Sequence, residues 1–268
     1  MVLMSLYRWM PFDVVVAHFD HGMRPSSADD AEFVRKKAKE YDMEFVLGKG
    51  HLGPNASEAE ARAARYRFLR KVMKEYGAQE IVTAHHVNDL AESVAINIIR
   101  GTGWRGLTPF SEPDVYQPFI YGTQPISKYD IYLLGLENDV TYRQDPSNTE
   151  DKYLRNRIRK SLFDGLNRDE MLRLLELHQD QIALRSEIEL EVKRLLPEDG
   201  RYERDWFRNL DDEVALEILY LGMKRKGILA TRPQILDFLN AIRTYSPHKK
   251  FNLPNDKLVT IYKNYFVL

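Results

Sequence analysis

Short apolar runs alternate with longer amphipathic segments over the first 100 residues. The runs at 13–18, 44–47 and 80–84 are rich in β-branched and other apolar residues and predict buried strands. Segments of helical length with one apolar face follow at 29–41, 57–76 and 89–100, and Gly101 and Gly103 end the third. Residues 1–10 have the pattern of the back half of a helix. This alternation predicts an α/β fold with a doubly wound parallel sheet.

The pattern changes near residue 167. A long amphipathic helix is predicted up to residue 196, where Pro197 and Gly200 break it. Two or three shorter helices are expected between residues 211 and 244, and residues 250–268 have the pattern of a small β-hairpin or meander. We therefore divide the chain into an α/β domain over 1–166 and a second, mostly helical domain over 167–268.

Composition excludes several classes of protein. The 268 residues contain 39 basic and 40 acidic side chains, so net charge argues neither for nor against a nucleic-acid partner. The absence of cysteine excludes disulfides, iron–sulfur clusters, thiolate zinc sites and cysteine nucleophiles, and it fits a cytoplasmic location. No apolar run is long enough for a membrane span, and the first ten residues do not resemble a signal peptide.

The densest polar cluster, AHHVNDLAE at 84–92, follows the third predicted strand. Its histidines and Asp89 are metal-ligand types, although no spacing typical of a metal site supports that interpretation. Its position at the start of a helix suits a phosphate, because backbone N–H groups point outward there. A simple helix cap with surface histidines explains the same residues, and the spacing alone does not decide between the three.

A second cluster, HFDHGMR at 18–24, follows the first predicted strand. Asp20 could hold a ribose or an adenine amine, and Gly22 would allow close approach of the backbone. The alternative is an ordinary turn with a glycine. Because ligands of parallel α/β sheets bind at the carboxyl ends of the strands, both clusters are expected at the same edge.

Three basic segments are also candidates. RGTGWRG at 100–106 is a glycine-rich loop with two arginines, although it follows a helix and is not a dinucleotide fingerprint. Arg155 and Arg159 are four residues apart, which would place them on one helical face that suits phosphate. A third stripe lies between Arg62 and Lys74. An ordinary solvated or salt-bridged helix surface is the competing interpretation for the last two.

Four segments resemble, in order and spacing, one family. They are VVVAHFDHGMRPSSADDAEFV, NASEAEARAARYRFL, TAHHVNDLAESVAINIIRGTGWRGL and QPFIYGTQPISKYDIYLLGLENDVTYRQDPSNTEDKYLRNRIRKSLF. Together they are similar to the tRNA(Ile)-lysidine synthetases, which belong to the N-type ATP-pyrophosphatase (PP-loop) group. The resemblance covers about residues 1–170, and the helical remainder is consistent with that family's tRNA-contacting domain.

The resemblance implies an adenine nucleotide α-hydrolase-like fold and a carbon–nitrogen ligase. ATP would adenylate the C2 carbonyl oxygen of a cytidine at the first anticodon position of tRNA(Ile), and the ε-amine of L-lysine would then displace AMP. Mg²⁺ is expected with ATP, because both steps involve phosphate charge. The sequence leaves open whether the protein forms a homodimer.

The resemblance also assigns roles to individual residues. Those implied to lie at the nucleotide are His18, Asp20, His21, Arg100, Gly101 and Gly103. Those implied to be catalytic are Asp89, Arg155 and Asp145, with Asp89 also the implied magnesium ligand. Those implied to bind the substrates are Glu92, Asn148, Asn156 and Arg159.

Two departures from the family pattern matter. The family's phosphate-binding loop, SGGxDS, is absent from these residues, and with it the first strand of the sheet. In addition, Asn88 stands where the family has an acid and Leu90 where it has glutamine. We expect a truncated or loop-deficient lysidine synthetase. The alternative is a non-catalytic tRNA- or nucleotide-binding relative; a related tRNA thiolase is disfavoured because those enzymes use cysteines.

Overall fold

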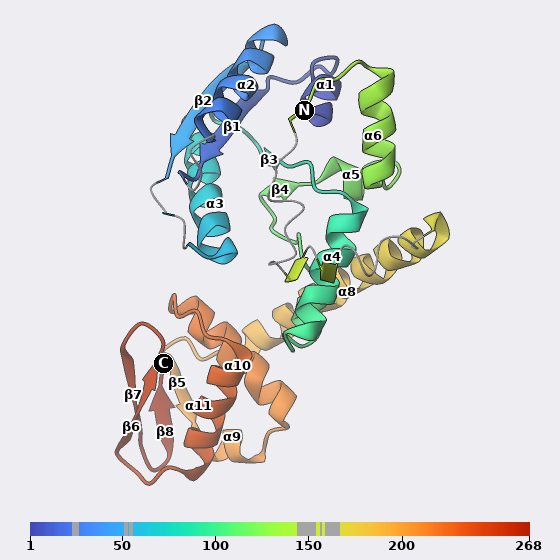
Figure 1. Ribbon diagram of the computed structural model, residues 1–268. Coiled ribbons are helices and arrows are strands. Elements are labelled where there is room, and N and C mark those ends of the chain that lie inside the picture. Colours follow the sequence, from blue (N-terminus) through green and yellow to red (C-terminus); the bar gives the residue numbers. More distant parts are fainter. Residues whose placement is uncertain (23–26, 51–52, 54–55, 144–153, 156, 159–166) are drawn as a thin grey trace. The chain divides into compact units, whose positions relative to one another are not determined.

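Figure 1 shows the computed structural model of the protein, which describes residues 1–22, 27–50, 53, 56–143, 154–155, 157–158 and 167–268. The chain forms two compact units. Unit 1 comprises Met1–Ile96 and Pro109–Glu176, and unit 2 comprises Asn97–Thr108 and Leu177–Leu268. The two domains predicted from the sequence, 1–166 and 167–268, stay a prediction.

The strands of unit 1 pair in parallel. Strand β1 (Val15–Asp20) pairs with β2 (Glu44–Lys49), and β3 (Ile81–Val82) pairs with β4 (Val115–Tyr116). Strands therefore form at all three positions predicted from apolar runs, whereas β4 was not predicted. Among the described residues these pairs make two separate two-stranded sheets, so the continuous doubly wound sheet stays a prediction.

Helices connect and cover these strands (Figure 1). They are α1 (Val2–Tyr7), α2 (Ser27–Glu40), α3 (Glu58–Glu75), α4 (Val87–Ile99), α5 (Pro118–Tyr121) and α6 (Lys128–Glu137). Helix α2 packs on β1 and β2, and α3 packs on β1 and β3. The Phe68 ring of α3 lies so close to Gly48 of β2 that a Cβ at Gly48 would come within 2.6 Å of it. Glycine is required there for the helix to approach the strand.

Local sequence signals fix where α3 and α6 begin. Ser57 accepts a hydrogen bond from the backbone of Glu60, whose carboxylate accepts one from the backbone of Ser57. Ser127 and Asp130 form the same reciprocal pair at α6. Each pair satisfies two helix N–H groups that have no partner within the helix. The cap that the sequence predicts near residue 57 is therefore present.

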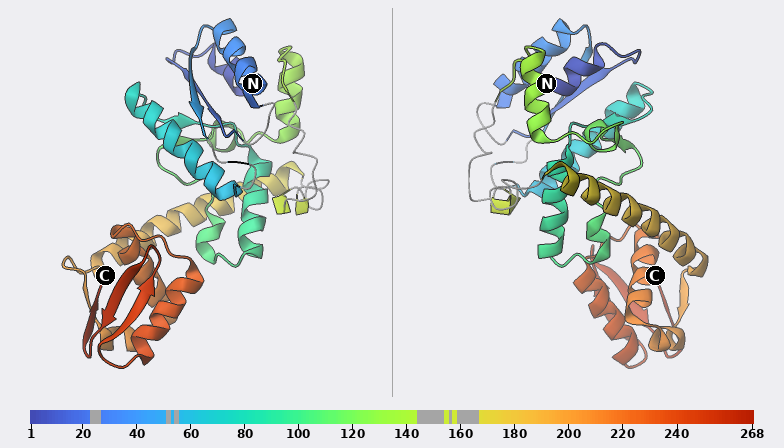
Figure 2. Two further views of the ribbon diagram at one scale, coloured as in Figure 1. Left: turned by 60° about the vertical axis from the view of Figure 1, so that its left-hand side comes forward. Right: turned by 90° about the vertical axis from the view of Figure 1, so that its right-hand side faces the viewer.

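Unit 2 contains an antiparallel sheet and the larger part of a long helix (Figure 2). Its elements are α8 (Arg168–Leu195), which begins in unit 1, η1 (Trp104–Leu107), β5 (Arg201–Glu203), α9 (Arg204–Asn209), α10 (Asp212–Arg225), α11 (Arg232–Thr244), β6 (Lys249–Leu253), β7 (Lys257–Ile261) and β8 (Tyr265–Val267). The sheet order is β5-β8-β7-β6. The long helix and the terminal meander agree with the sequence pattern, whereas β5 was not predicted.

Aromatic rings fill the core between the sheet and the helices of unit 2. The Phe266 ring of β8 stacks on Tyr202 of β5, with centroids 5.2 Å apart. It also meets Phe207 of α9 and Phe238 of α11 edge-on, at 5.2 and 5.6 Å. Phe207, Phe238 and Phe266 are all fully buried. These offset and edge-on contacts are the favourable geometries for aromatic pairs, and they join the sheet to its helices.

A buried arginine closes the end of this core. Arg204 is 1% exposed, and its guanidinium donates to the carbonyl oxygens of Ile242, Tyr245 and Tyr262. Two of these carbonyls lie at the carboxyl end of α11, where helix carbonyls have no partner within the helix and the helix dipole is negative. Burial lowers the pKa of Arg204. The cation is thus held by carbonyl dipoles.

We predict that Arg204→Met destabilises the protein by on the order of 3 kcal/mol, because it leaves three carbonyl oxygens without their donor. Urea unfolding followed by circular dichroism measures the change. Arg204→Lys is the matched control, since it keeps the charge but cannot reach all three oxygens, and we expect a smaller loss than for Met. A wild-type midpoint in Arg204→Met would mean that these bonds contribute nothing net.

Candidate functional site

The end of β1 carries the first polar cluster. His18 and Asp20 lie two residues apart in the strand, so their side chains leave the same face. The backbone N–H of Gly22 donates a 2.9 Å hydrogen bond to Asp20, and this bond lowers the pKa of the carboxyl. Gly22 has a positive φ of 66°, which favours glycine. A negative charge is therefore held in a fixed position at the carboxyl end of a parallel strand.

The two histidines of this cluster are kept neutral. Burial lowers the pKa of both His18 and His21. The His21 ring lies edge-on to Phe19, with centroids 5.0 Å apart, and its Nδ1 is buried without a hydrogen-bond partner among the described residues. A buried ring nitrogen without a partner is suited to contact with a ligand.

The second cluster lies where β3 leads into α4. The Thr83 hydroxyl and His85 Nδ1 are 2.8 Å apart, and the His85 ring packs on Phe110 with centroids 4.5 Å apart. Burial lowers the pKa of His85 to about 4, against the opposing effect of the Asp89 carboxylate. At neutral pH this ring is therefore uncharged. It can exchange hydrogen bonds, but it does not act as a cation.

Asp89 is held at the start of α4. Its Oδ2 accepts a 3.1 Å hydrogen bond from the backbone N–H of His86, and the backbone N–H of Asp89 donates in return to His86 Nδ1 at 3.4 Å. The helix cap, one of the three interpretations of this segment, is thus present. Asn88 has a separate structural task, because its side-chain oxygen accepts a 2.9 Å bond from the backbone N–H of Lys128 in α6.

One helical turn further, Glu92 is buried in α4 with only 1% of its surface exposed. The Arg155 guanidinium lies 3.5 Å from the Glu92 carboxylate and donates a 3.3 Å hydrogen bond to the Ser93 hydroxyl. These residues are more than 60 positions apart in sequence. A buried carboxylate needs a compensating cation, so this pairing brings Arg155 to the face of α4 that carries Glu92.

The remaining residues implied by the resemblance fall into two groups. Arg100, Gly101 and Gly103 belong to unit 2, where Gly103 lies 3.5 Å from the Arg232 guanidinium, measured from the position a Cβ would take. Their assignment to a nucleotide pocket stays a prediction. The other group lies outside the described residues and comprises Asp145, Asn148, Asn156 and Arg159.

Gln117 was missed by the sequence analysis. It follows β4 directly, and continuation of the β3–β4 register places it beside Thr83. Its side chain is fully buried, yet neither amide atom has a hydrogen-bond partner among the described residues. An unpaired buried amide is costly and rare, and such groups often mark functional positions. The only signal in the sequence is a glutamine before a proline at the end of a very short strand.

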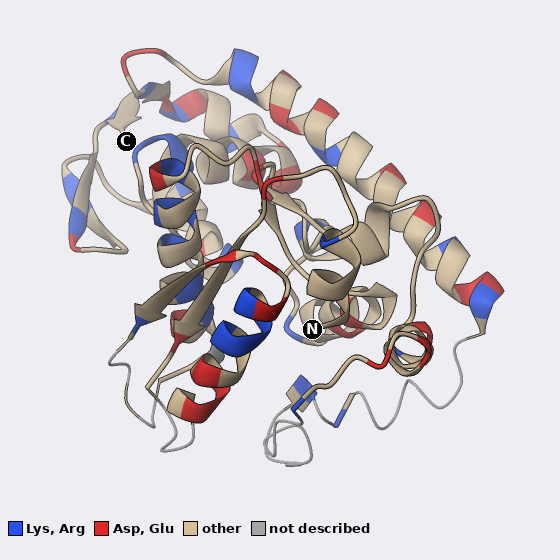
Figure 3. Ribbon diagram, turned by 90° about the horizontal axis from the view of Figure 1, so that it is seen from above, with Lys and Arg blue, Asp and Glu red and all other residues tan. Residues whose placement is uncertain are grey.

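The basic stripe on α3 is partly neutralised. Arg70 makes two hydrogen bonds to Asp114, at 2.5 and 3.0 Å, while Arg62 lies 3.6 Å from Glu112 and Lys71 lies 3.5 Å from Glu75. Along α8, basic and acidic residues likewise alternate (Figure 3). The salt-bridged interpretation of the α3 stripe therefore holds for these three residues, and no phosphate-binding surface follows from them alone.

The part of the chain that the structure describes contains neither a preformed metal site nor a helix that could cross a membrane. Among the described residues, no group of three or more His, Asp or Glu side chains is arranged to hold a metal ion. In the same part of the chain, no helix is both long and apolar enough to cross a membrane. A magnesium ion bound with a nucleotide needs only one or two protein carboxylates, because phosphate oxygens and waters complete its shell. Asp89 fits that smaller requirement.

Comparison with known proteins identifies relatives that match between 63% and 95% of this chain. A sequence profile described as PP-loop domain matches residues 1–166. The chain is 29% identical over 272 residues to a tRNA(Ile)-lysidine synthase of Persephonella marina, with 95% of this chain and 59% of that protein covered. It is 32% identical over 171 residues to a tRNA(Ile)-lysidine synthase of Streptococcus agalactiae, with 63% and 39% covered. A third such synthase, from Geobacter sulfurreducens, is 31% identical over 207 residues, with 72% and 44% covered.

The chain thus spans between 39% and 59% of the lengths of these three relatives. Among solved structures, the chain resembles the U34-tRNA thiolase NcsA from Methanococcus maripaludis, in a structure with its [4Fe-4S] cluster. The TM-score is 0.54 at 17% sequence identity, and the match covers 68% of this chain and 66% of the other. This likeness concerns the fold alone.

We predict that protonation of His85 destabilises the protein in mild acid. The folded pKa of about 4 lies below the ordinary value of 6.5, so between these values the unfolded chain binds more protons than the folded one. The free energy of unfolding therefore falls as pH falls through this window, by about 1 kcal/mol per pH unit for this residue.

Urea unfolding at several pH values between about 6.5 and 5 measures this slope. His85→Phe keeps a ring against Phe110 and removes the titrating group. We expect the variant to show a smaller slope over the same range. An identical slope in the two proteins would mean that His85 titrates normally in the folded state.

Proposed function

Because the chain belongs to the PP-loop domain family, we propose that it carries out the ATP-dependent ligation of lysine to a tRNA(Ile) anticodon cytidine. The observation that carries the proposal is the pairing of Arg155 with the buried Glu92, one turn from Asp89. It brings an arginine from another segment to the helix that carries the two carboxylates Asp89 and Glu92. The names of three relatives support the same activity.

The reaction has two chemical steps. The C2 carbonyl oxygen of cytidine attacks the α-phosphorus of ATP, which forms an adenylate and releases pyrophosphate. The neutral ε-amine of L-lysine then attacks C2, the C2–O bond breaks, and AMP leaves. Negative charge builds on phosphate in both steps, and the proton of the attacking amine must be removed.

The described residues fit these requirements in separate ways. Asp20 at the end of β1 holds a fixed carboxylate suited to a ribose or an adenine amine, beside the neutral His18 and His21. On α4, Asp89 and Glu92 would serve magnesium or the lysine amine, and Arg155 would face phosphate or the target base. Asp145, Asn148, Asn156 and Arg159 are proposed to complete the site over the substrates.

Mg²⁺ would be held by Asp89 and the phosphates of bound ATP, where it would neutralise phosphate charge. Arg100, Gly101 and Gly103 are proposed to contribute to the nucleotide pocket. We further propose a cytoplasmic location, since tRNA, ATP and free lysine are available there. A measurement of molecular mass in solution tests whether the protein forms a homodimer.

The test is AMP release from ATP that depends on both lysine and tRNA. It compares this chain with a version that carries an added N-terminal strand and SGGxDS loop. We expect release only in the extended version, because backbone amides of that loop would hold the pyrophosphate. Release in both would show that another segment does this work. Release in neither would favour a non-catalytic tRNA-binding protein.

We predict that Arg155→Ala lowers tRNA-dependent AMP release of the extended protein by about tenfold or more, since it removes a cation that compensates phosphate charge. Arg157→Ala is the matched control, because Arg157 is a more exposed arginine of the same segment. We expect it to keep turnover within about twofold of wild type. Equal losses in the two variants would mean that the segment acts through its general charge.

A further inference from the structure

A cavity lies within unit 2, between the segment 97–108 and the helices α10 and α11. Its volume is about 220 Å³. Trp104 and Arg105 of η1 line it, with Leu216, Glu217 and Tyr220 from α10 and Arg232 from the start of α11. None of these residues has a role in the site on β1, β3 and α4. The cavity is therefore a separate candidate for binding.

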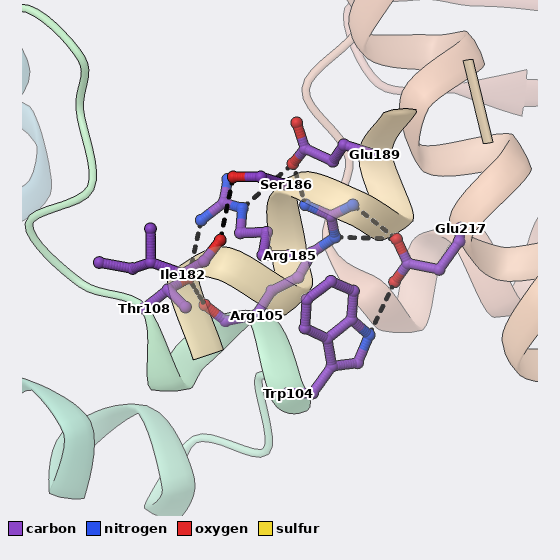
Figure 4. A network of polar contacts seen from close by, with 8 residues as sticks. All are labelled: Trp104, Arg105, Thr108, Ile182, Arg185, Ser186, Glu189 and Glu217. Atoms are coloured by element: carbon purple, nitrogen blue, oxygen red, sulfur yellow. Dashed lines mark hydrogen bonds and ion pairs between the residues drawn. The ribbon is translucent and has the colours of Figure 1, made fainter. Parts of the chain in front are cut away.

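A network of polar contacts holds Trp104 and Arg105 at the wall of this cavity (Figure 4). The Arg105 guanidinium lies 4.2 Å from the Tyr220 ring centroid and 4.8 Å from that of Trp104. It donates to the Glu217 carboxylate at 2.6 and 2.9 Å, and the Trp104 indole N–H donates to the other oxygen of Glu217 at 3.1 Å. The Trp104 ring is thus held by a hydrogen bond and the Tyr220 ring contacts the Arg105 guanidinium before any ligand arrives, which lowers the entropy cost of binding.

A second carboxylate completes the network from α8. Glu189 accepts a 2.6 Å hydrogen bond from Arg105 and a 3.1 Å bond from Arg185, which in turn donates to the Thr108 hydroxyl at 2.8 Å. Although burial acts to lower it, the pKa of Arg105 is raised by its bonds to Glu217 and Glu189. Arg105 is thus a permanent cation, and the charges of the two glutamates are already compensated by arginines.

The rim of the cavity offers a cation that can change partners. Arg232 is 36% exposed and donates a 2.5 Å hydrogen bond to Glu213, which is 61% exposed. An ion pair this open to water contributes little, so a phosphate can replace the carboxylate at small cost. The floor, in contrast, is apolar at Leu216 and Ile235.

We propose that this cavity binds one unpaired nucleotide of an RNA, with the base against Trp104 and Tyr220 and the phosphate on Arg232. The inference rests on the proposed tRNA substrate and adds a contact that lies in unit 2. The volume is below the roughly 300 Å³ at which sites for drug-sized molecules begin, which suits a single base. Rigid aromatic faces with an arginine beside them are the usual means of holding unpaired bases. A lysine side chain fits less well, because Arg105 and the Trp104 indole already donate to both oxygens of Glu217.

The test measures the binding of a tRNA(Ile) transcript to the full chain and to two variants. Tyr220→Leu keeps apolar bulk but removes the stacking surface, and Arg232→Gln removes the rim cation. We expect each to weaken tRNA binding about tenfold. Arg225→Gln, on the exposed last turn of α10, is the matched control and should bind within about twofold of wild type. Thermal unfolding checks that all four proteins are folded.

A second probe reports on the cavity itself. In a Trp9→Phe, Trp206→Phe protein, Trp104 is the only tryptophan, since the chain has three. We expect a single-stranded RNA hexamer to quench Trp104 fluorescence, and a fully paired RNA duplex of the same length to leave it unchanged. Addition of Tyr220→Leu to this protein should weaken the quenching.

The outcomes separate this inference from the proposed function. The cavity proposal alone would be overturned if Tyr220→Leu and Arg232→Gln both bound tRNA with wild-type affinity. In that case lysine- and tRNA-dependent AMP release by the extended protein would remain intact. Equal quenching by hexamer and duplex would also overturn it, because backbone charge would then explain binding. Absence of tRNA binding by the wild-type chain would overturn both proposals.

Discussion

A carboxylate that is almost wholly removed from water must either lose its charge or keep a cation beside it, and Glu92 is in this position. Its partner, Arg155, comes from a segment more than 60 residues further along the chain. The pairing therefore does two things at once. It stabilises a charge on an otherwise apolar stretch of α4, and it brings an arginine to the face where Asp89 begins the helix. Removal of Arg155 would leave the Glu92 carboxylate buried without this cation, which costs stability.

Unit 2 solves the same problem of buried charge in two other ways. Arg204 has carbonyl oxygens as its partners, two at the carboxyl end of α11 and one between β7 and β8, so its charge is shared among them. Arg105 instead has two carboxylates and two aromatic faces. In the first arrangement each guanidinium nitrogen donates to a backbone carbonyl, and the group serves the fold. The second fixes two rings at the wall of a cavity, so the same physical requirement produces a surface suited to binding.

Much of the fold follows from local signals that the sequence displays. The β-branched run before His18 forms β1, and Ser57 with Glu60 marks the start of α3 by hydrogen bonds between residues three apart. By contrast, β4 and β5 are two and three residues long, and no periodicity can be read from so few positions. The burial of Arg204 was equally invisible, because a single arginine in a polar stretch looks like any surface residue.

In the candidate site, too, residues without a local sequence signal could not be predicted. His18, Asp20 and Asp89 could be singled out as candidates, because the first two lie at the end of a recognisable strand and Asp89 follows another. Gln117 could not, since its interest lies in the absence of a bonding partner after folding.

The glycine-rich segment RGTGWRG at 100–106 shows why a motif alone does not predict the role of its residues. Its glycines suggest a phosphate loop, and two of them do have positive φ, at 65° and 70°. Within unit 2, however, that backbone turns the chain so that Trp104 and Arg105 meet Glu217. A glycine pattern reports where the backbone bends, and the chemistry belongs to the side chains that the bend presents.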